Sequence, residues 1–379
     1  MKILLTGGGT GGHFYPLIAV AGEINEVAKE NRLLSPKLYY MSTDPYNEGL
    51  LFENNITFVK TSAGKLRRSL SPGNLILNFF DLWKTFFGVL GALWKMFVIY
   101  PDVVFGKGGY TSFPALLAAR LLLIPVVIHE SDSKPGRVNA WAGKFARKVA
   151  ISYPDAAKYF KKEKTAYTGN PIRREIEEPL TSESHEFWNF SKDIPTIFVI
   201  GGSTGSVFIN EIIIRSLPSL VERYQIIHQT GKNNIKVIEE TRDVVLQGNQ
   251  YKDRYKPMGY LNVLELRRAS GVADVIISRA GSTIFEIASW GKPAIIVPIP
   301  EKTSHDQRSN AFAYARSGAA IVIEEENLAE GVLLAEIERI LTTPGEKERM
   351  SQAAHNFSRR DAAKLIATEI MAIAIEHET

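Results

Sequence analysis

Short apolar runs alternate with apolar residues at helical spacing through the first half of the chain. The runs are KLYYMS (37–42), ITFVKT (56–61), DVVFGK (102–107), PVVIHE (125–130), KVAISY (148–153) and KTAYTGN (164–170). This alternation is typical of βαβ units, in which helices cover a parallel sheet. The same pattern starts again at TIFVIGGSTGS (196–206) and continues to AAIVI (319–323). The pattern predicts an α/β protein with two doubly wound, Rossmann-like halves.

A polar interval at residues 173–194 separates the halves and has no clear periodicity. Its Pro179, glutamates and hydroxyl side chains are typical of a linker. We therefore predict an N-terminal domain at 1–172, a C-terminal domain at 173–345, and a helical segment at 346–379 that packs back across the junction. Ligands of doubly wound sheets bind beyond the carboxyl ends of the strands. The two domains are therefore expected to face a cleft.

Each half opens with a strand that ends in glycines. Residues 2–13, KILLTGGGTGGH, run from an apolar strand into a glycine turn, and apolar residues at helical spacing resume after Pro16. Glycine lets a ligand lie against the main chain, and the first turn of the following helix offers unpaired N–H groups and the positive end of its dipole. We expect the loop to bind an anion or a sugar hydroxyl. His13 stands at the start of that helix and is expected to point into the same space.

The glycine spacing also fits a second class of protein. Gly7, Gly9 and Gly12 match the G-x-G-x-x-G spacing of a nicotinamide or flavin site, and Asp44 stands near the place of the acidic ribose partner. An oxidoreductase is therefore an open alternative, although it leaves the second glycine turn at 201–205 unexplained.

Composition narrows the classes of protein further. Hydrophobic residues make up 45% of the 379 residues and charged residues 23%, as in soluble globular proteins. The chain has no cysteine, which excludes disulfides, thiolate metal sites and a cysteine nucleophile and fits a reducing compartment. The formal charge of +4 is mild and no stretch combines dense Lys and Arg with aromatics, so nucleic acid is not expected as a partner. The first residues form the strand that the glycine turn needs, which argues against a cleavable signal peptide.

Residues 75–100 are long and apolar enough to be taken for a membrane span. Asp81, Thr85 and Lys95 recur at helical spacing along one side, where a bilayer would penalise the charged groups. A helix with a broad apolar face fits better, and packing into the protein core is expected to account for most of that face. The aromatic residues, preceded by the basic residues of 65–68, support a second interpretation, namely attachment to an anionic membrane surface.

The ordered motifs resemble those of the MurG-type N-acetylglucosaminyltransferases. The matching stretches, in the family's order, are GGTGGH (8–13), AGKLRR (63–68), GKGGYTSFP (106–114), IPVVIHE (124–130), TGNPIR (168–173), GGSTG (201–205) and SRAGS (278–282) with Glu286, followed by Gln307 and Asn310. Each is a loop motif of modest value alone. Together they span nearly the whole chain, and the match is specific.

The resemblance implies a two-domain GT-B glycosyltransferase of peptidoglycan synthesis. Such an enzyme moves N-acetylglucosamine from UDP-N-acetylglucosamine, with inversion at the anomeric carbon, to the muramoyl-pentapeptide of a polyprenyl-diphosphate lipid. The resemblance places the sugar nucleotide mainly on the C-terminal half and the lipid-linked acceptor against the N-terminal half. It also implies a peripheral protein at the cytoplasmic face of the cell membrane.

The resemblance implies neither a cofactor nor a metal ion. In agreement, the sequence contains no D-x-D motif, the usual carboxylate clamp for a catalytic divalent metal. The diphosphate is then expected to be neutralised by helix N-termini, backbone N–H groups and an arginine.

Two residues are the catalytic candidates. His13 is the candidate general base for the acceptor hydroxyl, because an imidazole has a pKa near working pH. The alternative is that His13 only positions the donor sugar or diphosphate through a hydrogen bond. Glu130 is the second candidate. The predicted substrate-binding residues are Thr10, Gly11, Gly12, Tyr110, Asp132, Arg173, Ser203, Leu261, Ser282, Thr283, Glu286, Gln307 and Asn310.

The resemblance gives several of these residues a role toward the nucleotide. Arg173 and Ser203 are expected at the diphosphate, with Arg174 as an alternative to its neighbour. Glu286 is expected to accept both ribose hydroxyls, unless it only stabilises a helix N-terminus. Leu261 stands where the family cups the uracil.

Other residues are assigned to the sugar and the acceptor. Gln307 resembles a donor-sugar contact, and Tyr110 either lines the acceptor pocket or caps its own loop. Ser131 and Asp132 stand where the family usually has glutamine and asparagine, and an ionised aspartate accepts hydrogen bonds without donating them. Two alternatives to the peptidoglycan reaction stay open: the same fold acting on another lipid acceptor, and a non-catalytic scaffold at a membrane surface.

Overall fold

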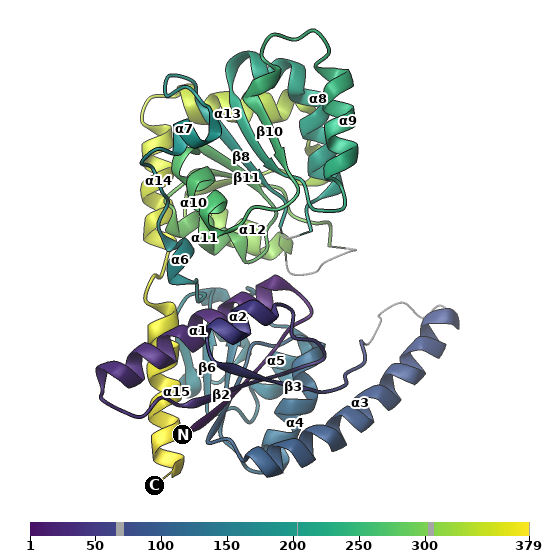
Figure 1. The fold of residues 1–379 in the computed structure, drawn as a ribbon, viewed down its shortest axis with the longest axis vertical. Helices are drawn as coiled ribbons and strands as arrows, with labels where there is room; N and C mark the ends of the chain where they lie inside the picture. Colours follow the sequence, from purple (N-terminus) through teal and green to yellow (C-terminus); the bar gives the residue numbers. More distant parts are fainter. Residues whose placement is uncertain (66–71, 203, 302–306, 379) are drawn as a thin grey trace. The chain divides into compact units, whose positions relative to one another are not determined.

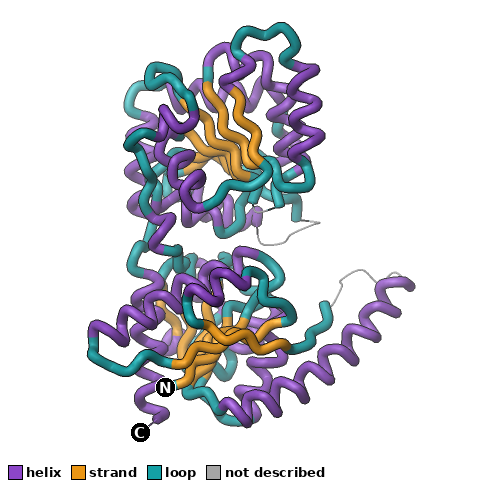
Figure 2. Tube along the Cα trace, viewed as in Figure 1, coloured by secondary structure: helices purple, strands orange, loops and turns teal. Residues whose placement is uncertain are grey.

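The computed structural model describes residues 1–65, 72–202, 204–301 and 307–378 (Figure 1). The chain divides into two compact units. Unit 1 comprises residues 1–173 and 360–379, and unit 2 comprises residues 174–359. In Figure 2 the strands, in orange, lie at the centre of each unit with helices around them.

Seven parallel strands form the sheet of unit 1. They are β1 (Lys2–Thr6), β2 (Lys37–Ser42), β3 (Ile56–Lys60), β4 (Val103–Gly106), β5 (Val126–Glu130), β6 (Lys148–Ile151) and β7 (Thr165–Tyr167), in the order β3-β2-β1-β4-β5-β6-β7. The chain builds outward from β1 to β3 and then returns to place β4 on the other side of β1, with Thr6 opposite Gly106. This reversal is the switch point at which doubly wound sheets bind ligands. These strands confirm the strands that the apolar runs of the sequence predicted.

Two helical layers cover this sheet because successive side chains of a strand point to opposite faces. Ile3 and Leu5 pack with α1 (Gly11–Glu30) and α15 (Ala362–Glu378) in one core cluster. Leu4 packs with α3 (Pro72–Ile99) and α4 (Phe113–Leu121) in another. The other elements of unit 1 are α2 (Glu48–Glu53), α5 (Arg137–Ala142) and the 3₁₀ turns η1 (Tyr110–Ser112), η2 (Pro154–Tyr159) and η3 (Lys162–Lys164). Since the central strands are buried on both faces, they show continuous apolar runs.

Unit 2 repeats the plan with six parallel strands. They are β8 (Thr196–Ile200), β9 (Gln225–Gln229), β10 (Tyr255–Met258), β11 (Val275–Ser278), β12 (Ala294–Ile296) and β13 (Ala320–Val322), in the order β10-β9-β8-β11-β12-β13. The helices are α6 (Arg174–Glu177), α7 (Ser184–Trp188), α8 (Val207–Arg223), α9 (Ile235–Val245), α10 (Val263–Val272), α11 (Thr283–Ser289), α12 (Gln307–Ala315), α13 (Glu330–Thr342) and α14 (Glu346–Phe357), with 3₁₀ turns η4 (Lys252–Arg254) and η5 (Glu325–Asn327). The switch point lies between β8 and β11, where Ile200 pairs with Ser278.

The interval predicted as a linker is packed structure within unit 2. It contains α6 and α7, and Trp290 Nε1 donates to Ile176 O at 2.6 Å. Trp188 and Phe190 are buried. The linker prediction was wrong because these helices have only four and five residues, too short to show a periodicity.

Most of the apolar side of α3 does not face the core. Asp81 is buried, and Thr85 Oγ1 accepts a hydrogen bond from Gly64 N at 2.9 Å, so the polar side of the helix packs on the protein. The outward side carries large apolar residues that are 47% to 69% exposed: Ile76, Leu77, Phe79, Phe80, Leu82, Trp83, Phe86, Phe87, Leu90, Trp94, Phe97 and Val98. The expectation that core packing accounts for this face was wrong. On the covered side, Gly88 lies so close to Ser62 that an added Cβ would be 1.7 Å from Ser62 O.

The last residues form two helices that belong to different units. Helix α14 lies in unit 2, whereas α15 lies in unit 1 and packs on α1. Ile366, Ile370 and Ile373 of α15 are part of the core between these two helices and the sheet. The C-terminal helix therefore completes the hydrophobic core of unit 1.

We expect Ile370→Ala to lower the free energy of unfolding by about 2–5 kcal/mol, because it removes atoms from a fully buried side chain. Leu365 on the same helix is 45% exposed, so Leu365→Ala should change that free energy by less than about 0.5 kcal/mol. Chemical denaturation of the full chain measures both. Equal effects of the two changes would contradict the packing of α15 on α1.

Candidate active site

Two glycine loops meet at the switch point of unit 1. The loop after β1 contains Gly8 (φ 140°) and Gly9 (φ 83°), and the loop after β4 contains Gly108 (φ 85°) and Gly109 (φ 79°), values that favour glycine. A Cβ atom added to Gly109 would lie 3.2 Å from Gly8 O and 3.7 Å from His13 Nε2. The main chains of the two loops therefore lie close together beside an imidazole.

His13 lies in the first turn of α1 and is half-buried. Its Nδ1 is 2.9 Å from Thr10 Oγ1. When Nδ1 carries the proton and donates it to Thr10, Nε2 is left as an acceptor, which is the form that a general base needs. Burial and the positive charge of Lys107 lower the pKa of His13 to about 4. The imidazole is therefore uncharged at neutral pH, and the same burial and charge oppose its protonation.

The start of α1 offers main-chain donors next to this imidazole. Thr10 is the N-cap residue, and its side chain makes no capping hydrogen bond. The N–H groups of Gly11 and Gly12 belong to the first turn, in which a helix provides no internal acceptors. No acidic side chain occupies that turn. The positive end of the helix can therefore receive an anionic oxygen.

Glu130 ends β5 and is 3% exposed. Its Oε1 accepts from Asp132 N at 2.9 Å, and its Oε2 accepts from Gly136 N and Asn139 Nδ2, both at 3.0 Å. Burial and the charge of Asp132 raise the pKa of Glu130 to about 7, although these hydrogen bonds act in the opposite direction. The carboxyl group holds the loop after β5, and that loop carries the half-buried Asp132 along the same edge of the sheet.

Two further predicted residues belong to this region of unit 1. Tyr110 begins η1, is 36% exposed, and has a ring carbon 3.5 Å from the position that a Cβ would take at Gly9. The Arg173 guanidinium lies 4.5 Å from the centroid of the Tyr15 ring on α1. Arg174, the alternative to Arg173, begins α6 in unit 2.

In unit 2 the glycine loop after β8 is fixed by neighbouring strands. Gln229 Nε2 donates to Gly202 O at 3.0 Å. Gly205 (φ 73°) lies so close to the loop after β9 that an added Cβ would be 1.8 Å from Thr230 O. The predicted Ser203 lies outside the described residues.

Arg279, in the loop after β11, joins three loops at the same edge. Its Nε and Nη2 donate to Ser206 Oγ at 2.9 and 2.7 Å, its Nη1 donates to Val297 O at 3.1 Å, and its Nη2 pairs with Glu325 Oε1 at 2.6 Å. Arg279 is 8% exposed, and burial lowers its pKa. Arg279 is not among the site residues predicted from the sequence. The available signal was an arginine directly after a buried strand.

Four residues predicted for the nucleotide lie near these loops. Ser282 is the N-cap residue of α11, Thr283 is its first residue, and Glu286 follows in the same short helix; all three are half-buried. Leu261 lies after β10, its side chain is buried, and its N–H donates to Gln229 Oε1 at 3.1 Å. Gln229 therefore connects Leu261 to the glycine loop.

The start of α12 approaches the same loop after β11. Gln307 Nε2 lies 3.9 Å from the position that a Cβ would take at Gly281, and Asn310 Nδ2 donates to Ala280 O at 3.4 Å. The structure thus gathers Ser282, Thr283, Gln307 and Asn310 in unit 2, and Thr10, Gly11, Gly12, His13 and Tyr110 in unit 1.

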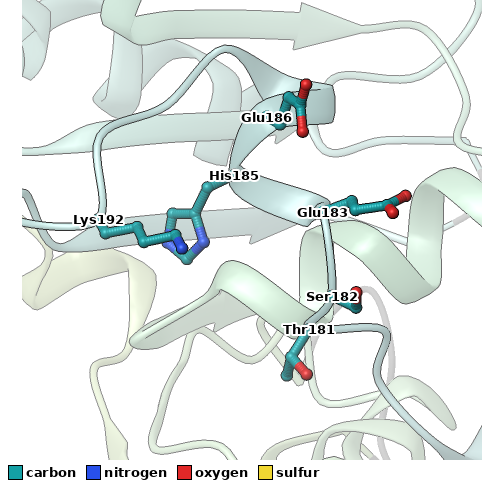
Figure 3. A pocket seen from close by; sticks show the side chains of 6 residues that line it. All are labelled: Thr181, Ser182, Glu183, His185, Glu186 and Lys192. Atoms are coloured by element: carbon teal, nitrogen blue, oxygen red, sulfur yellow. The ribbon is translucent and has the colours of Figure 1, made fainter.

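A separate hollow of about 390 Å³ lies around α7 in unit 2 (Figure 3). It is lined by Thr181, Ser182, Glu183, His185, Glu186 and Lys192. None of the predicted site residues lines this hollow. In the described part of the chain, no group of three or more His, Cys, Asp and Glu side chains is arranged to hold a metal ion.

Comparison with known proteins identifies the family. Residues 3–151 match the N-terminal domain of glycosyltransferase family 28, and residues 196–366 match its C-terminal domain. A protein of Clostridium botulinum (strain Alaska E43 / Type E3) is 34% identical over 98% of this chain and 97% of its own length. One of Clostridium novyi is 36% identical over 89% of this chain and 90% of its own length. Both are named UDP-N-acetylglucosamine--N-acetylmuramyl-(pentapeptide) pyrophosphoryl-undecaprenol N-acetylglucosamine transferase.

A solved structure agrees with these relatives. The crystal structure of MurG from Acinetobacter baumannii aligns with a TM-score of 0.71 at 25% identity, covering 98% of this chain and 99% of that one. The chain belongs to the MurG family. MurG membership confirms the predicted GT-B fold and glycosyltransferase class, and it shows that the oxidoreductase alternative was wrong.

Proteins outside the MurG family share the fold at lower identity. Staphylococcus aureus MnaA, solved with UDP, aligns with a TM-score of 0.67 at 16% identity over 97% of this chain and 95% of that one. The UDP-GlcNAc 2-epimerase of Neisseria meningitidis, solved with UDP-GlcNAc, aligns with a TM-score of 0.67 at 15% identity over 98% and 100%. These likenesses concern the fold alone.

Proposed function

We propose that this MurG-family enzyme transfers N-acetylglucosamine from UDP-N-acetylglucosamine to the muramoyl-pentapeptide of a polyprenyl-diphosphate lipid. The observation that carries the proposal is the match over 98% of the chain to a relative whose name states this reaction. The geometry of the two carboxyl edges supports a division of labour between the units.

The donor nucleotide is proposed to bind at the carboxyl edge of unit 2. Glu286, half-buried near the start of α11, would accept the two ribose hydroxyls, and Leu261 would contact the uracil. Gln307, beside the loop after β11, would contact the sugar. Arg279 holds the surrounding loops in place and is itself engaged, so we assign it a structural part in donor binding.

The transfer is proposed to be a direct displacement at the edge of unit 1. The acceptor oxygen bonds to C1 of N-acetylglucosamine while the bond from C1 to the diphosphate oxygen breaks and UDP leaves with the electron pair, which inverts C1. His13 Nε2 takes the hydroxyl proton, with Nδ1–H held by Thr10. The contacts of Glu130 favour a positioning part for it, through the loop that carries Asp132, over direct proton transfer.

Release of UDP tests this function. We expect release from UDP-N-acetylglucosamine only in the presence of a lipid-linked muramoyl-pentapeptide, with or without chelator. His13→Ala removes the base and should lower kcat by roughly 100-fold to 10,000-fold, while the donor Kd measured by calorimetry stays within about twofold of wild type, since tenfold would correspond to a lost contact of about 1.4 kcal/mol.

His185→Ala is the matched control, because it removes an imidazole from the hollow around α7. It should leave kcat and the donor Kd unchanged. Transfer by His13→Ala at the wild-type rate would show that His13 is not the general base. If the protein binds the donor but transfers the sugar only to a different lipid, the fold and the donor assignment stand and the acceptor assignment is contradicted.

We also propose that the protein attaches peripherally to the cytoplasmic face of the membrane that holds its lipid acceptor. Segment Ile76–Ile99 of α3 is long and apolar enough to cross a membrane, and 17% of its most apolar stretch is buried. One side of α3 nevertheless packs against the rest of unit 1, where Thr61 Oγ1 donates a hydrogen bond to Gly88 O at 3.2 Å. Lipid therefore does not surround the helix, which favours a helix lying on the surface over one that crosses.

Basic residues next to α3 support an anionic surface. Lys65 is exposed, and the Lys84 side chain on α3 is 66% exposed. Such residues are attracted to anionic headgroups. Arg67 and Arg68, which entered the sequence prediction, lie outside the described residues.

Vesicle sedimentation tests the attachment. Phe87→Glu with Trp94→Glu places two charges on the exposed apolar face of α3, where the native residues are 62% and 69% exposed. Binding to vesicles containing anionic lipid should fall roughly tenfold or more. The control is Phe52→Glu on α2, a residue 85% exposed away from α3. Equal binding by both variants and the wild type would count against α3 as the attachment site.

A further inference from the structure

His228 is a buried histidine that none of the roles above uses. It lies in β9, its side chain is fully buried, and both of its ring nitrogens meet another side chain. Nε2 is 3.0 Å from Asn210 Oδ1 on α8, and Nδ1 is 2.8 Å from the hydroxyl oxygen of Tyr255, the first residue of β10. The ring therefore connects a helix to two neighbouring strands.

The orientation of the Asn210 amide decides which ring nitrogen carries the proton. Asn210 Nδ2 donates to the main-chain oxygen of Thr230 at 2.9 Å, and a carbonyl oxygen can only accept. The amide therefore turns Oδ1 toward His228, and Nε2 must carry the proton that this oxygen accepts. Nδ1 then accepts the hydrogen of the Tyr255 hydroxyl. Burial lowers the pKa of His228 to about 3, which agrees with a ring that holds this single proton.

The hydrogen bond to Thr230 extends this network to the glycine loop after β8. Thr230 directly follows β9, and a Cβ added to Gly205 would lie 1.8 Å from Thr230 O. A Cβ added to Gly231 would lie 2.0 Å from Thr204 O. The loops after β8 and β9 therefore pack main chain against main chain, which only glycine permits. A group that fixes Thr230 O also fixes the place of the glycine loop.

Asn210 connects the same network to the start of α8. Ser206 is the N-cap residue of α8, and Asn210 N donates to Ser206 O at 2.8 Å. No acidic side chain occupies the first turn of this helix, whose N–H groups lack internal acceptors. One side chain thus holds both the glycine loop and the helix start, which are the main-chain groups that an anionic ligand of unit 2 would meet.

We propose that His228 is a positioning residue for the sugar nucleotide: through Asn210 it holds the glycine loop after β8 and the first turn of α8 in the form that receives the donor's diphosphate. A loop that is held in place before the ligand arrives loses less conformational entropy on binding. The proposal rests on the proposed function for the place of the sugar nucleotide on unit 2. Binding of UDP alone tests it without turnover.

The test compares UDP binding by calorimetry in variants of the full chain. His228→Phe keeps a buried ring and removes both hydrogen bonds. It should raise the UDP Kd and the donor KM roughly tenfold, as for a lost contact, with kcat within about threefold of wild type. Hydrogen–deuterium exchange should become faster in the loop after β8.

Two further variants separate the proposed role from general packing. His228→Gln returns an N–H donor toward Asn210 and should recover most of the wild-type affinity for UDP. Tyr255→Phe removes only the hydrogen bond at Nδ1. It is the matched control and should keep the wild-type Kd within about twofold.

The position of the proton is tested in the wild type by nitrogen NMR of the histidine rings, with the His228 signals assigned from His228→Phe. We expect a protonated Nε2 and a bare Nδ1. A protonated Nδ1 would overturn the proposal, because the Asn210 amide could then not serve His228 and Thr230 together.

The binding experiment can overturn the proposal in three ways. A folded His228→Phe that binds UDP like the wild type does so, and so does an equal loss of binding in Tyr255→Phe. Where His228→Phe does not fold, Asn210→Ala removes the same connection and replaces it. If neither folds while Tyr255→Phe does, the network serves folding and the proposal falls. Weakened UDP binding by His228→Phe, in a protein whose wild type transfers no sugar, would refute the proposed function and leave this inference standing.

Discussion

The site depends on the parallel direction of every strand in both sheets. Parallel neighbours can be joined only by long crossovers, so each strand end passes into a loop and then into the start of a helix. All loops of a sheet therefore gather at one edge, together with the unpaired N–H groups of the helix starts. Where the winding reverses, between β1 and β4 and between β8 and β11, the chains leave in opposite directions and open a place for a ligand. Glycines with positive φ line both places because only a bare main chain lets the loops approach this closely.

Each edge holds a buried cation at its switch point. In unit 1 it is Lys107, with one long hydrogen bond to Asn170. In unit 2 it is Arg279, which is fully engaged with Ser206, Val297 and Glu325. The two cations therefore differ in engagement: Arg279 connects loops, whereas Lys107 has a single long contact.

The features predictable from the sequence were those written in local patterns. Strands and glycine turns can be recognised from a few consecutive residues. The two halves, the loops and the position of His13 at the start of α1 were therefore predictable from the sequence. The contacts of Lys107 and Arg279 were not, because their partners Asn170 and Glu325 are distant in the chain. For α3 the pattern gave the width of the apolar face but not which side is covered. On the covered side Gly88 meets Ser62, a contact that hydrophobicity does not encode.

The central claim is that the two edges divide the substrates, with the sugar nucleotide on unit 2. Hydrogen–deuterium exchange of the full chain, with and without UDP-N-acetylglucosamine, tests it most directly. The account predicts slower exchange in the loops after β8 and β11 and at the starts of α8 and α11, with unchanged exchange in the loop after β1. Slower exchange confined to the loops after β1 and β4 would contradict it.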